Sequence, residues 1–507
     1  MKITRSLAIV ALISLAASVN AQQFLGGYFY GQDAFRYSEV KSSGTARMQG
    51  IGGGYAALGA DATNAFSNPA GLGFYNRSEL SITPVFNSLN STSNYIGTST
   101  NLTSNGANIG QLAFILSNNG IGTRKKRSTL GISYSKQVNF LSNYEYAGTN
   151  RGSSMMDFFA EKATRRGANS TTLDNEFDPN RGMADTPTAM YYQTFMIDPN
   201  AQGNAPYKKV ESSLPVNQNG AINTKGSLNQ WNFSYGVNYD DKTYLGFSVG
   251  LIRLNYEYVG NHQERFPSGR VFNGFNFEDD LTTRGSGLNL TVGGIIKATD
   301  NIQLGASVTT PTWLTLTETY NSAITIDQKA NTFTTDFKTV STLPNDFPYK
   351  ITTPLRANGG ATFFLPNKLG FISADAEFVG YRGMNVSDSE DASWSSDQKK
   401  AITNTFNNVV NLKAGTELRF DNFRVRGGVK YMPDPYKLRS DDLDRSQMVF
   451  SIGGGYRTSK FYIDAAGVFN KFVAGYTPYE LSDASRFASA KINTTRTDFV
   501  VSVGTFF

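Results

Sequence analysis

Residues 231–239 read Trp-Asn-Phe-Ser-Tyr-Gly-Val-Asn-Tyr, a strict alternation of large apolar residues with small or polar ones. The same period of two recurs from Leu245 to Leu251 and from Val410 to Phe420. Successive side chains of a strand point to opposite faces, so each segment predicts a strand with one apolar and one polar face. A soluble β-sandwich also alternates, and alternation alone therefore does not separate a sandwich from a membrane barrel.

The lengths of the connections between strands favour the barrel. Six connections are short, and the other seven, which are longer, alternate with them along the chain. An outer-membrane barrel has short turns on one side, long loops on the other and an even number of strands. The predicted fold is all-β: a 14-stranded antiparallel transmembrane outer-membrane β-barrel. The predicted strands are 78–86, 108–117, 128–138, 228–239, 242–258, 285–297, 301–320, 350–366, 368–383, 408–420, 423–432, 447–457, 460–472 and 494–506. The short connections lie near Asn119-Gly120, Asp240-Asp241, Thr299-Asp300, Pro366-Asn367, Asp421-Asn422 and Thr458-Ser459.

The last strand of the chain supports this fold. Phe499, Val501, Val503, Thr505 and Phe507 share one face. As the edge of a soluble sheet such a face would invite aggregation, whereas a barrel removes the edge by closing on itself. Bacterial barrel proteins commonly end on phenylalanine, and we expect the barrel assembly machinery to read Phe507.

The first 21 residues predict a secretory signal peptide. Lys2 and Arg5 precede an apolar run from Leu7 to Ala17, and cleavage is expected before Gln22. That run is too short to be a membrane anchor. The chain has no cysteine, which excludes disulfides, thiolate metal sites and a cysteine nucleophile. An exported protein without disulfides suits a bacterial envelope, and the expected location is the outer membrane of a Gram-negative bacterium.

The composition agrees with a barrel and argues against other classes. Hydrophobic residues make up only 39% of the chain, yet it holds 49 Gly, 26 Tyr and 36 Phe. Strands with one face toward lipid and one toward water need such a mixture. Basic residues are scattered apart from one cluster at 124–127, so no nucleic-acid partner is predicted. We expect a monomer.

A glycine- and alanine-rich segment, Gly44 to Tyr75, lies between the signal and the first strand. Gly52-x-Gly54-x-x-Ala57 matches a loose dinucleotide fingerprint, but no buried strand precedes it and no βαβ unit follows, so nucleotide binding is set aside. Its position instead predicts a plug, or hatch, inside the barrel. The predicted domains are a signal peptide (1–21), a hatch (22–77) and a barrel (78–507).

The longest predicted loop, 139–227, contains one helical segment, 154–165. Two interpretations of its apolar face are open: part of a hydrophobic site outside the cell, or a loop helix that packs on its neighbours. The rest of the loop, 167–225, is rich in Asn, Thr, Gly and Pro and is expected to be mobile. The apolar face of the helix carries Met155, Met156, Phe158 and Phe159.

No catalytic, metal or cofactor site is predicted, and the chain is not expected to be an enzyme. The one histidine, His262, is expected at a strand end or in the following loop, and no serine is recognisably paired with it. A site with several imidazoles is excluded. A haem axial ligand at His262 stays open as an alternative to a solvated loop histidine.

Several charged residues fall on the lumen face of predicted strands. They could form a selectivity lining, but charges that face one another in a narrow barrel need partners, so we favour a salt-bridged network that holds the wall and anchors the plug. These residues are Asp375, Glu377, Lys413, Glu417 and Arg419.

Residues 50–59, GIGGGYAALG, and 65–74, AFSNPAGLGF, resemble the FadL/TodX family of outer-membrane transporters. The hatch of that family carries an Asn-Pro-Ala motif, matched here by Asn68, Pro69 and Ala70. Weaker similarities lie at 308–311, a strand that ends near a proline, and at 424–435. The 46 residues from Gln22 to Ser67 are a long lead for this family.

The resemblance implies passive transport of long-chain fatty acids or other hydrophobic compounds. The ligand would enter from an outer groove, the hatch would shift, and the ligand would leave sideways into outer-membrane lipid beside lipopolysaccharide. Asn68 would bond neighbouring backbone, and Pro69 would fix a turn; an ordinary turn is the alternative. A haemin receptor and a surface adhesin or structural barrel remain alternative functions.

Overall fold

The structure is a computed structural model that describes residues 30–39, 43–119, 127–333, 335, 337–388, 391–437 and 441–507. The predicted signal peptide, the start of the predicted hatch (22–29) and three residues of the basic cluster (124–126) lie outside the described residues.

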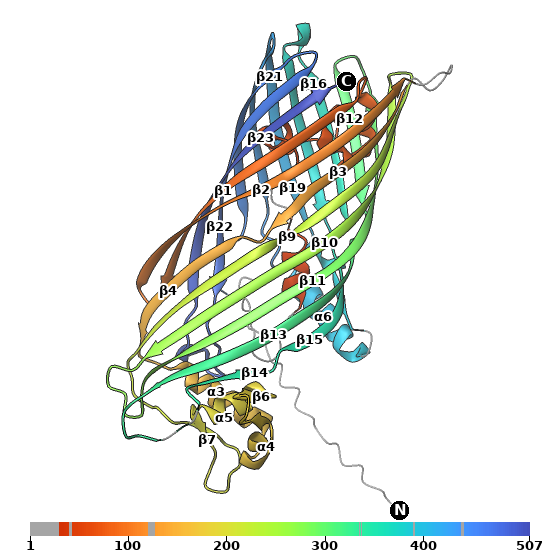
Figure 1. The fold of residues 1–507 in the computed structure, drawn as a ribbon. Helices are drawn as coiled ribbons and strands as arrows, with labels where there is room; N and C mark the ends of the chain where they lie inside the picture. The colour runs from red at the N-terminus through yellow and green to blue at the C-terminus, as the bar shows by residue number, and fades with distance from the viewer. Residues whose placement is uncertain are drawn as a thin grey trace, which may run out of the picture.

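A closed barrel of fourteen antiparallel strands forms the body of the protein, counting each interrupted strand once (Figure 1). The predicted strand count is confirmed. β1 pairs with β23 from Glu79↔Phe506 to Asn94↔Lys491, which closes the wall. In wall order the strands are β1 (Glu79–Tyr95), β2 (Thr98–Asn119), β3 (Arg127–Asn139) with β4 (Ser142–Asn150), β9 (Val216–Tyr239), β10 (Thr243–Arg265), β11 (Phe272–Lys297), β12 (Ile302–Thr309) with β13 (Trp313–Gln328), β16 (Arg356–Phe364) with β15 (Asn345–Thr352), β17 (Gly370–Val379) with β18 (Asn385–Ser387), β19 (Val409–Phe420), β20 (Phe423–Met432), β21 (Gln447–Arg457), β22 (Phe461–Tyr476) and β23 (Ala490–Phe506).

The outer surface divides into an apolar belt and a polar extension. Exposed large apolar side chains gather on the part of the barrel near the short turns, as expected of a lipid-facing surface. Farther out, the same strands expose polar residues such as Asn90, Asn94, Asn101 and Thr103. No helix in the described part of the chain is long and apolar enough to cross a membrane. The belt includes Leu80, Ile82 and Phe86 on β1, Phe114 and Leu116 on β2, Phe233 on β9, Phe247 on β10, Phe450 and Ile452 on β21, and Phe499 and Val503 on β23.

Several predicted strands are too short at the end of the barrel away from the short turns, whereas the predicted strand 368–383 ends there at Val379. β1 and β2 continue to a two-residue turn at Ile96 and Gly97, whose φ values of 46° and 77° suit a tight hairpin. The prediction of a long loop there is wrong. These outer segments expose polar side chains instead of large apolar ones, so their sequence resembles a loop.

Two predicted strands, 301–320 and 350–366, are each interrupted by a proline. The first breaks into β12 and β13 around Pro311, and the second into β15 and β16 around Pro354. Proline lacks the N–H that a sheet ladder needs. The broken strands remain neighbours, because Thr312 N donates to Thr353 Oγ1 over 2.8 Å and Thr353 N donates to the Thr312 carbonyl over 3.0 Å.

Residues 30–39 and 43–75, the first that the structure describes, lie inside the barrel (Figure 1, red). We call residues 43–75 the lumenal segment; it contains α2 (Ala46–Gly50) and the 3₁₀ helices η1 (Ala62–Ala65) and η2 (Pro69–Phe74). α2 contacts β20 to β23, whereas η2 contacts β3, β9, β10 and β11. α1 (Gly31–Arg36) lies farther out, in a cluster that includes Tyr95, Tyr146, Tyr256 and Tyr258. Of the lead before Asn68, α1 thus lies in the outer part of the lumen.

A folded cap covers the end of the barrel opposite the short turns (Figure 1). The predicted helix at 154–165 is confirmed as α3 (Met155–Arg166), which packs against α5 (Pro187–Gln193). Residues 167–225 were expected to be mobile, but they form further elements whose apolar side chains close a second core. The other short elements are α4 (Ser170–Asn175), β5 (Phe177–Asp178), β6 (Met183–Ala184), β7 (Ile197–Asp198), β8 (Lys208–Lys209), β14 (Thr339–Thr342), η3 (Pro366–Lys368), η4 (Tyr381–Gly383), α6 (Ala392–Thr405) and η5 (Ala484–Arg486).

Candidate functional site

The Asn-Pro-Ala motif starts η2 and fixes it to the rest of the lumenal segment. The Asn68 side chain is fully buried; its Oδ1 accepts from Ala70 N over 3.2 Å, which caps the helix. Its Nδ2 donates to the Ala56 carbonyl over 2.6 Å and lies 3.4 Å from two wall carbonyls, those of Gly294 and Ala306. Pro69 occupies the first helical position, where its fixed φ and missing N–H are favourable. Asn68 therefore links η2, the segment before it and the wall.

A row of glycines in the wall receives η2. Gly236, Gly246 and Gly293 are direct partners on β9, β10 and β11. A Cβ at Gly246 would overlap the Pro69 carbonyl group, and one at Gly293 would overlap the Asn68 side chain. Only residues without a side chain let the backbone of η2 approach the sheet this closely. We call this row the glycine seat.

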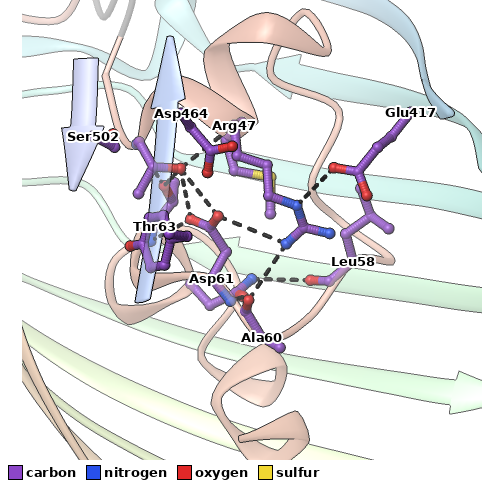
Figure 2. Close-up of polar contacts among 12 residues, drawn as sticks. Arg47, Leu58, Ala60, Asp61, Thr63, Glu417, Asp464 and Ser502 are labelled. Atoms are coloured by element: carbon purple, nitrogen blue, oxygen red, sulfur yellow. Dashed lines mark hydrogen bonds and ion pairs between the residues drawn. The ribbon is translucent and has the colours of Figure 1, made fainter. Parts of the chain in front are cut away.

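The other end of the lumenal segment is held by charges (Figure 2). Arg47 Nε donates to Glu417 Oε2 over 3.1 Å, and its guanidinium lies 3.7 Å from Asp61 Oδ2 and bonds the Ala60 carbonyl over 3.3 Å. Glu417 also accepts from Arg426 over 2.8 Å, and Arg426 reaches Asp464 over 2.7 Å. Each of these five side chains is buried, so every charge needs the partners that the network supplies.

The predicted lumen charges fall into this cluster and a neighbouring one. Glu417 and Arg419 belong to the Arg47 cluster, with Arg419 Nε 3.1 Å from Glu417 Oε1. Asp375 accepts from Ala56 N over 2.7 Å. Glu377 pairs with Lys413 at 3.1 Å and with Arg356 at 2.9 Å. All five predicted residues therefore contact another charge or the lumenal segment.

The wall is incomplete between β2 and β3. Within the described residues, the two strands pair from Asn119↔Arg127 only as far as Gln111↔Ser135. There Gln137 forms a bulge against β9, and β3 ends at Asn139 before the chain resumes as β4. Bulges bend a strand and locally disrupt its ladder. The residues of β2 before Gln111 therefore form no backbone hydrogen-bond ladder with the end of β3. We call this place the wall gap.

Two cavities lie between the middle of the lumen and the wall gap. One lies behind the gap, is bordered by Gln49, Asn87, Asn108 and Gln137, and leaves about 20 Å³ for the centres of water molecules. A larger, partly open cavity in the middle of the lumen shares Gln137 with it and leaves about 100 Å³. Since a water needs roughly 10–15 Å³ on this measure, the first holds one or two and the second several.

The apolar residues predicted on the cap helix lie in a closed core. Met155, Met156, Phe158 and Phe159 are at most 1% exposed and pack with Tyr191, Phe275 and Phe277. In this structure they pack on neighbours and form no open groove.

His262 lies inside the barrel, not in a solvated loop as expected. It sits on β10, which continues well past the predicted end at residue 258. Its ring is 3% exposed, with Nδ1 2.7 Å from the Tyr146 hydroxyl and Nε2 3.2 Å from Glu264 Oε1. Glu264 also accepts from Met155 N over 2.8 Å and from Ser154, so this polar group fastens the cap helix to the wall.

Sequence reasoning missed the partners of the lumenal segment. The charge network also includes Arg47, Asp61 and Arg426, which were not predicted. The glycines of the glycine seat were predicted only as small residues that alternate with apolar ones. The alternation itself carried a usable signal, because Gly236, Gly246 and Gly293 all occupy lumen-facing positions of predicted strands. No comparable signal points to Arg47, whose partner Glu417 is 370 residues away.

The architecture is that of the FadL-type outer-membrane barrels. Neither a protein-family model nor a curated protein sequence matches the chain. Among solved structures, a FadL homologue of Pseudomonas aeruginosa is 12% identical, with a TM-score of 0.55 over 92% of this chain and 99% of its own. The toluene transporter TodX of Pseudomonas putida is 14% identical, with a TM-score of 0.50 over 93% of this chain and 100% of its own. At such identities the likeness establishes the fold.

Proposed function

We propose that this chain carries hydrophobic compounds passively across the outer membrane of a Gram-negative bacterium and releases them sideways into lipid. The observation that carries the proposal is the wall gap, with a cavity behind it that the lumenal segment borders through Gln49. The fold, shared with a structure described as a toluene transporter, supports it.

A lateral path suits an apolar cargo. Each methylene moved out of water gains about 0.8 kcal/mol, so binding and delivery to lipid need no energy source. The wall gap lies next to the apolar belt, since Ile109 and Leu112 of β2 are exposed on its border. Outer-membrane lipid and lipopolysaccharide would surround that belt, and the compound would pass from the lumen to lipid without crossing bulk water.

In this proposal residues 22–77 act as the hatch and residues 78–507 as the barrel. The Asn68-Pro69-Ala70 turn on the glycine seat holds one end of the hatch. The ion pairs around Arg47 hold the other end, beside the cavity at the wall gap. Asp375, Glu377, Lys413, Glu417 and Arg419 serve as anchors and not as a selectivity lining, because each already has a partner.

The proposal extends to the cap and the chain end. Met155, Met156, Phe158 and Phe159 would hold the cap together, and an outer ligand groove would require that core to open. The assembly machinery would read the last strand at Phe507, whose N–H and carbonyl bond Ser78. We propose that one barrel transports as a monomer.

The alternative of a haemin receptor gains no support from His262. An axial ligand needs a free ring nitrogen and an open face. Both nitrogens of this buried ring already have partners in Tyr146 and Glu264.

Uptake into proteoliposomes tests the function. Full-length protein would be reconstituted, and the entry of oleate and of toluene would be followed against protein-free vesicles of the same lipid. We expect both compounds to enter faster with protein, and Pro69→Gly, which loosens the hatch turn, to change the rate. If neither compound enters faster with the native chain or with Pro69→Gly, the proposed function is wrong.

A further inference from the structure

The central cavity of the lumen is lined mainly by neutral hydrogen-bonding groups. It is partly open and leaves about 100 Å³ for the centres of water molecules. Carboxamides line it from several strands, including Gln137, Gln230, Asn289 and Asn358, and threonines line the side where Pro354 interrupts the wall. This composition is unexpected for a site that would hold only hydrocarbon.

The carboxamides form a connected row. Gln230 Nε2 donates to Asn232 Oδ1 over 2.6 Å and lies 3.3 Å from Asn289 Oδ1. Asn289 Nδ2 donates to Thr312 Oγ1 over 3.1 Å. The Asn358 carboxamide oxygen, in contrast, is buried and has no hydrogen-bond partner among the described residues. A buried acceptor without a partner is costly, and a ligand hydroxyl would satisfy it.

The charged residues at the cavity already pair with each other, so they do not favour an ionic ligand. Arg356 and Glu377 pair with each other at 2.9 Å, and Glu377 also pairs with Lys413 at 3.1 Å. Arg356 in addition donates to the Ser38 carbonyl. A carboxylate headgroup would therefore have to displace an existing partner before it could bind Arg356.

Aromatic rings complete the lining. Tyr37, Tyr55 and Phe66 border the cavity, and Tyr37 also belongs to the tyrosine-rich cluster farther out. Specific pockets combine such apolar faces with a few placed polar groups. A sugar ring presents C–H groups to an aromatic ring and hydroxyls to amides, so it matches both kinds of lining residue.

We propose that the central cavity binds the uncharged sugar of a glycoside whose other part is apolar. This inference rests on the proposed transport function and narrows its cargo from hydrocarbons to neutral glycosides. A plain hydrocarbon would strip water from the amide row without replacing its hydrogen bonds. A neutral glycoside replaces them and keeps an apolar body for the passage to lipid.

The test compares phenyl β-glucoside with toluene in proteoliposomes of the full chain. We expect the glucoside to enter at least tenfold faster with native protein than without it. The double variant Gln230→Met/Asn289→Leu keeps the approximate side-chain volume but removes the amides, and we expect glucoside entry to fall at least tenfold while toluene entry is unchanged or higher. Asn470→Leu removes an interior amide that bonds Gln447 away from this cavity, and should leave both rates within twofold.

Asn358→Leu is a second variant, and it breaks no hydrogen bond of the Asn358 oxygen. It should lower the entry of the glucoside and leave the entry of toluene unchanged. Heat-modifiable migration of each variant on a gel would show that the barrel is folded. Entry of toluene but not glucoside through the native chain would overturn the sugar site and leave the transport function standing. Equal glucoside entry through native protein and both cavity variants would also overturn it. If neither compound enters faster with protein, both the proposed transport function and the proposed sugar site are wrong.

Discussion

Both ends of the lumenal segment pack on glycines of the wall, but only the end at α2 is also held by ion pairs. η2 rests on the glycine seat through its backbone and the neutral Asn68 side chain, with the sheet close enough to exclude any Cβ. At the other end, the backbone of Ile51, the residue after α2, lies as close to Gly415 of β19 and Gly428 of β20, and Arg47 of α2 in addition bonds Glu417. The contact at η2 depends on close packing and neutral hydrogen bonds, whereas the contact at α2 combines close packing with a few charged atoms.

This difference indicates which end can move. The close-packed backbone contacts at both ends have few alternative positions, because a small shift produces a clash or a void. A long charged side chain can exchange partners, and Glu417 keeps Arg426 and Arg419 when Arg47 leaves. The end that carries Arg47 also borders the cavity at the wall gap, through Gln49. Because the exchangeable ion pairs and this cavity both lie at α2, we expect the hatch to open at α2 and to pivot on η2.

Gly246→Ala should have the largest effect of the substitutions that probe this comparison. The added Cβ would overlap the Pro69 carbonyl, and overpacking of this kind costs about 3 kcal/mol. The measurement is the urea midpoint of the folded barrel, with vesicle leakage as a second readout. Gly359→Ala is the matched control, because a Cβ there meets nothing within 4 Å. An unchanged midpoint in Gly246→Ala would mean that η2 is not seated on the wall.

Arg47→Met should have a smaller effect on stability and a clear effect on leakage. Glu417 retains two arginines, so we expect a loss of about 2 kcal/mol, below the usual cost of breaking a buried pair. Ion leakage through reconstituted vesicles should rise because α2 is released. Arg419→Met removes another partner of Glu417 without touching the lumenal segment. Equal leakage in the two variants would contradict an anchoring role for Arg47.

Asn68→Ala should have the smallest effect, a loss of about 1–2 kcal/mol for a helix cap and its buried hydrogen bonds. Asn68→Asp separates the two functions of this side chain. It keeps the oxygen that caps Ala70 but loses the donor to Ala56 and places a carboxylate near two carbonyls. We expect its urea midpoint to be no higher than that of Asn68→Ala. If both variants have the urea midpoint of the native protein, Asn68 is an ordinary turn residue.

Much of this arrangement could be predicted from local sequence. Alternation places the side chains of a strand, so the fourteen strands, their order and the lumen-facing charges followed from it. The prediction weakened where lipid no longer covers the wall, because outward residues such as Asn90 and Asn101 give no apolar signal. That is why the long β1–β2 hairpin and the burial of His262 were missed.

Contacts between distant parts of the chain could not be predicted in this way. Nothing near Arg47 identifies Glu417 as its partner, and nothing near Gly246 shows that Pro69 lies above it. The wall gap depends on where the pairing of β2 with β3 stops and on one extra residue, Gln137, in the register with β9. Those features are set by the closed barrel as a whole.

The central claim, that cargo leaves through the wall gap, is tested most directly by locking the gap. The side chains of Asn108 and Asn139 both donate to Asn87 Oδ1, over 2.8 and 3.1 Å, so they reach the same oxygen from the two sides of the gap. The chain has no cysteine, and Asn108→Cys/Asn139→Cys would introduce a single bridge. We predict that toluene entry into proteoliposomes falls at least tenfold when the pair is oxidised and returns on reduction, while each single variant transports normally. Native rates in the oxidised double variant, with the bridge verified by mass spectrometry, would contradict lateral release.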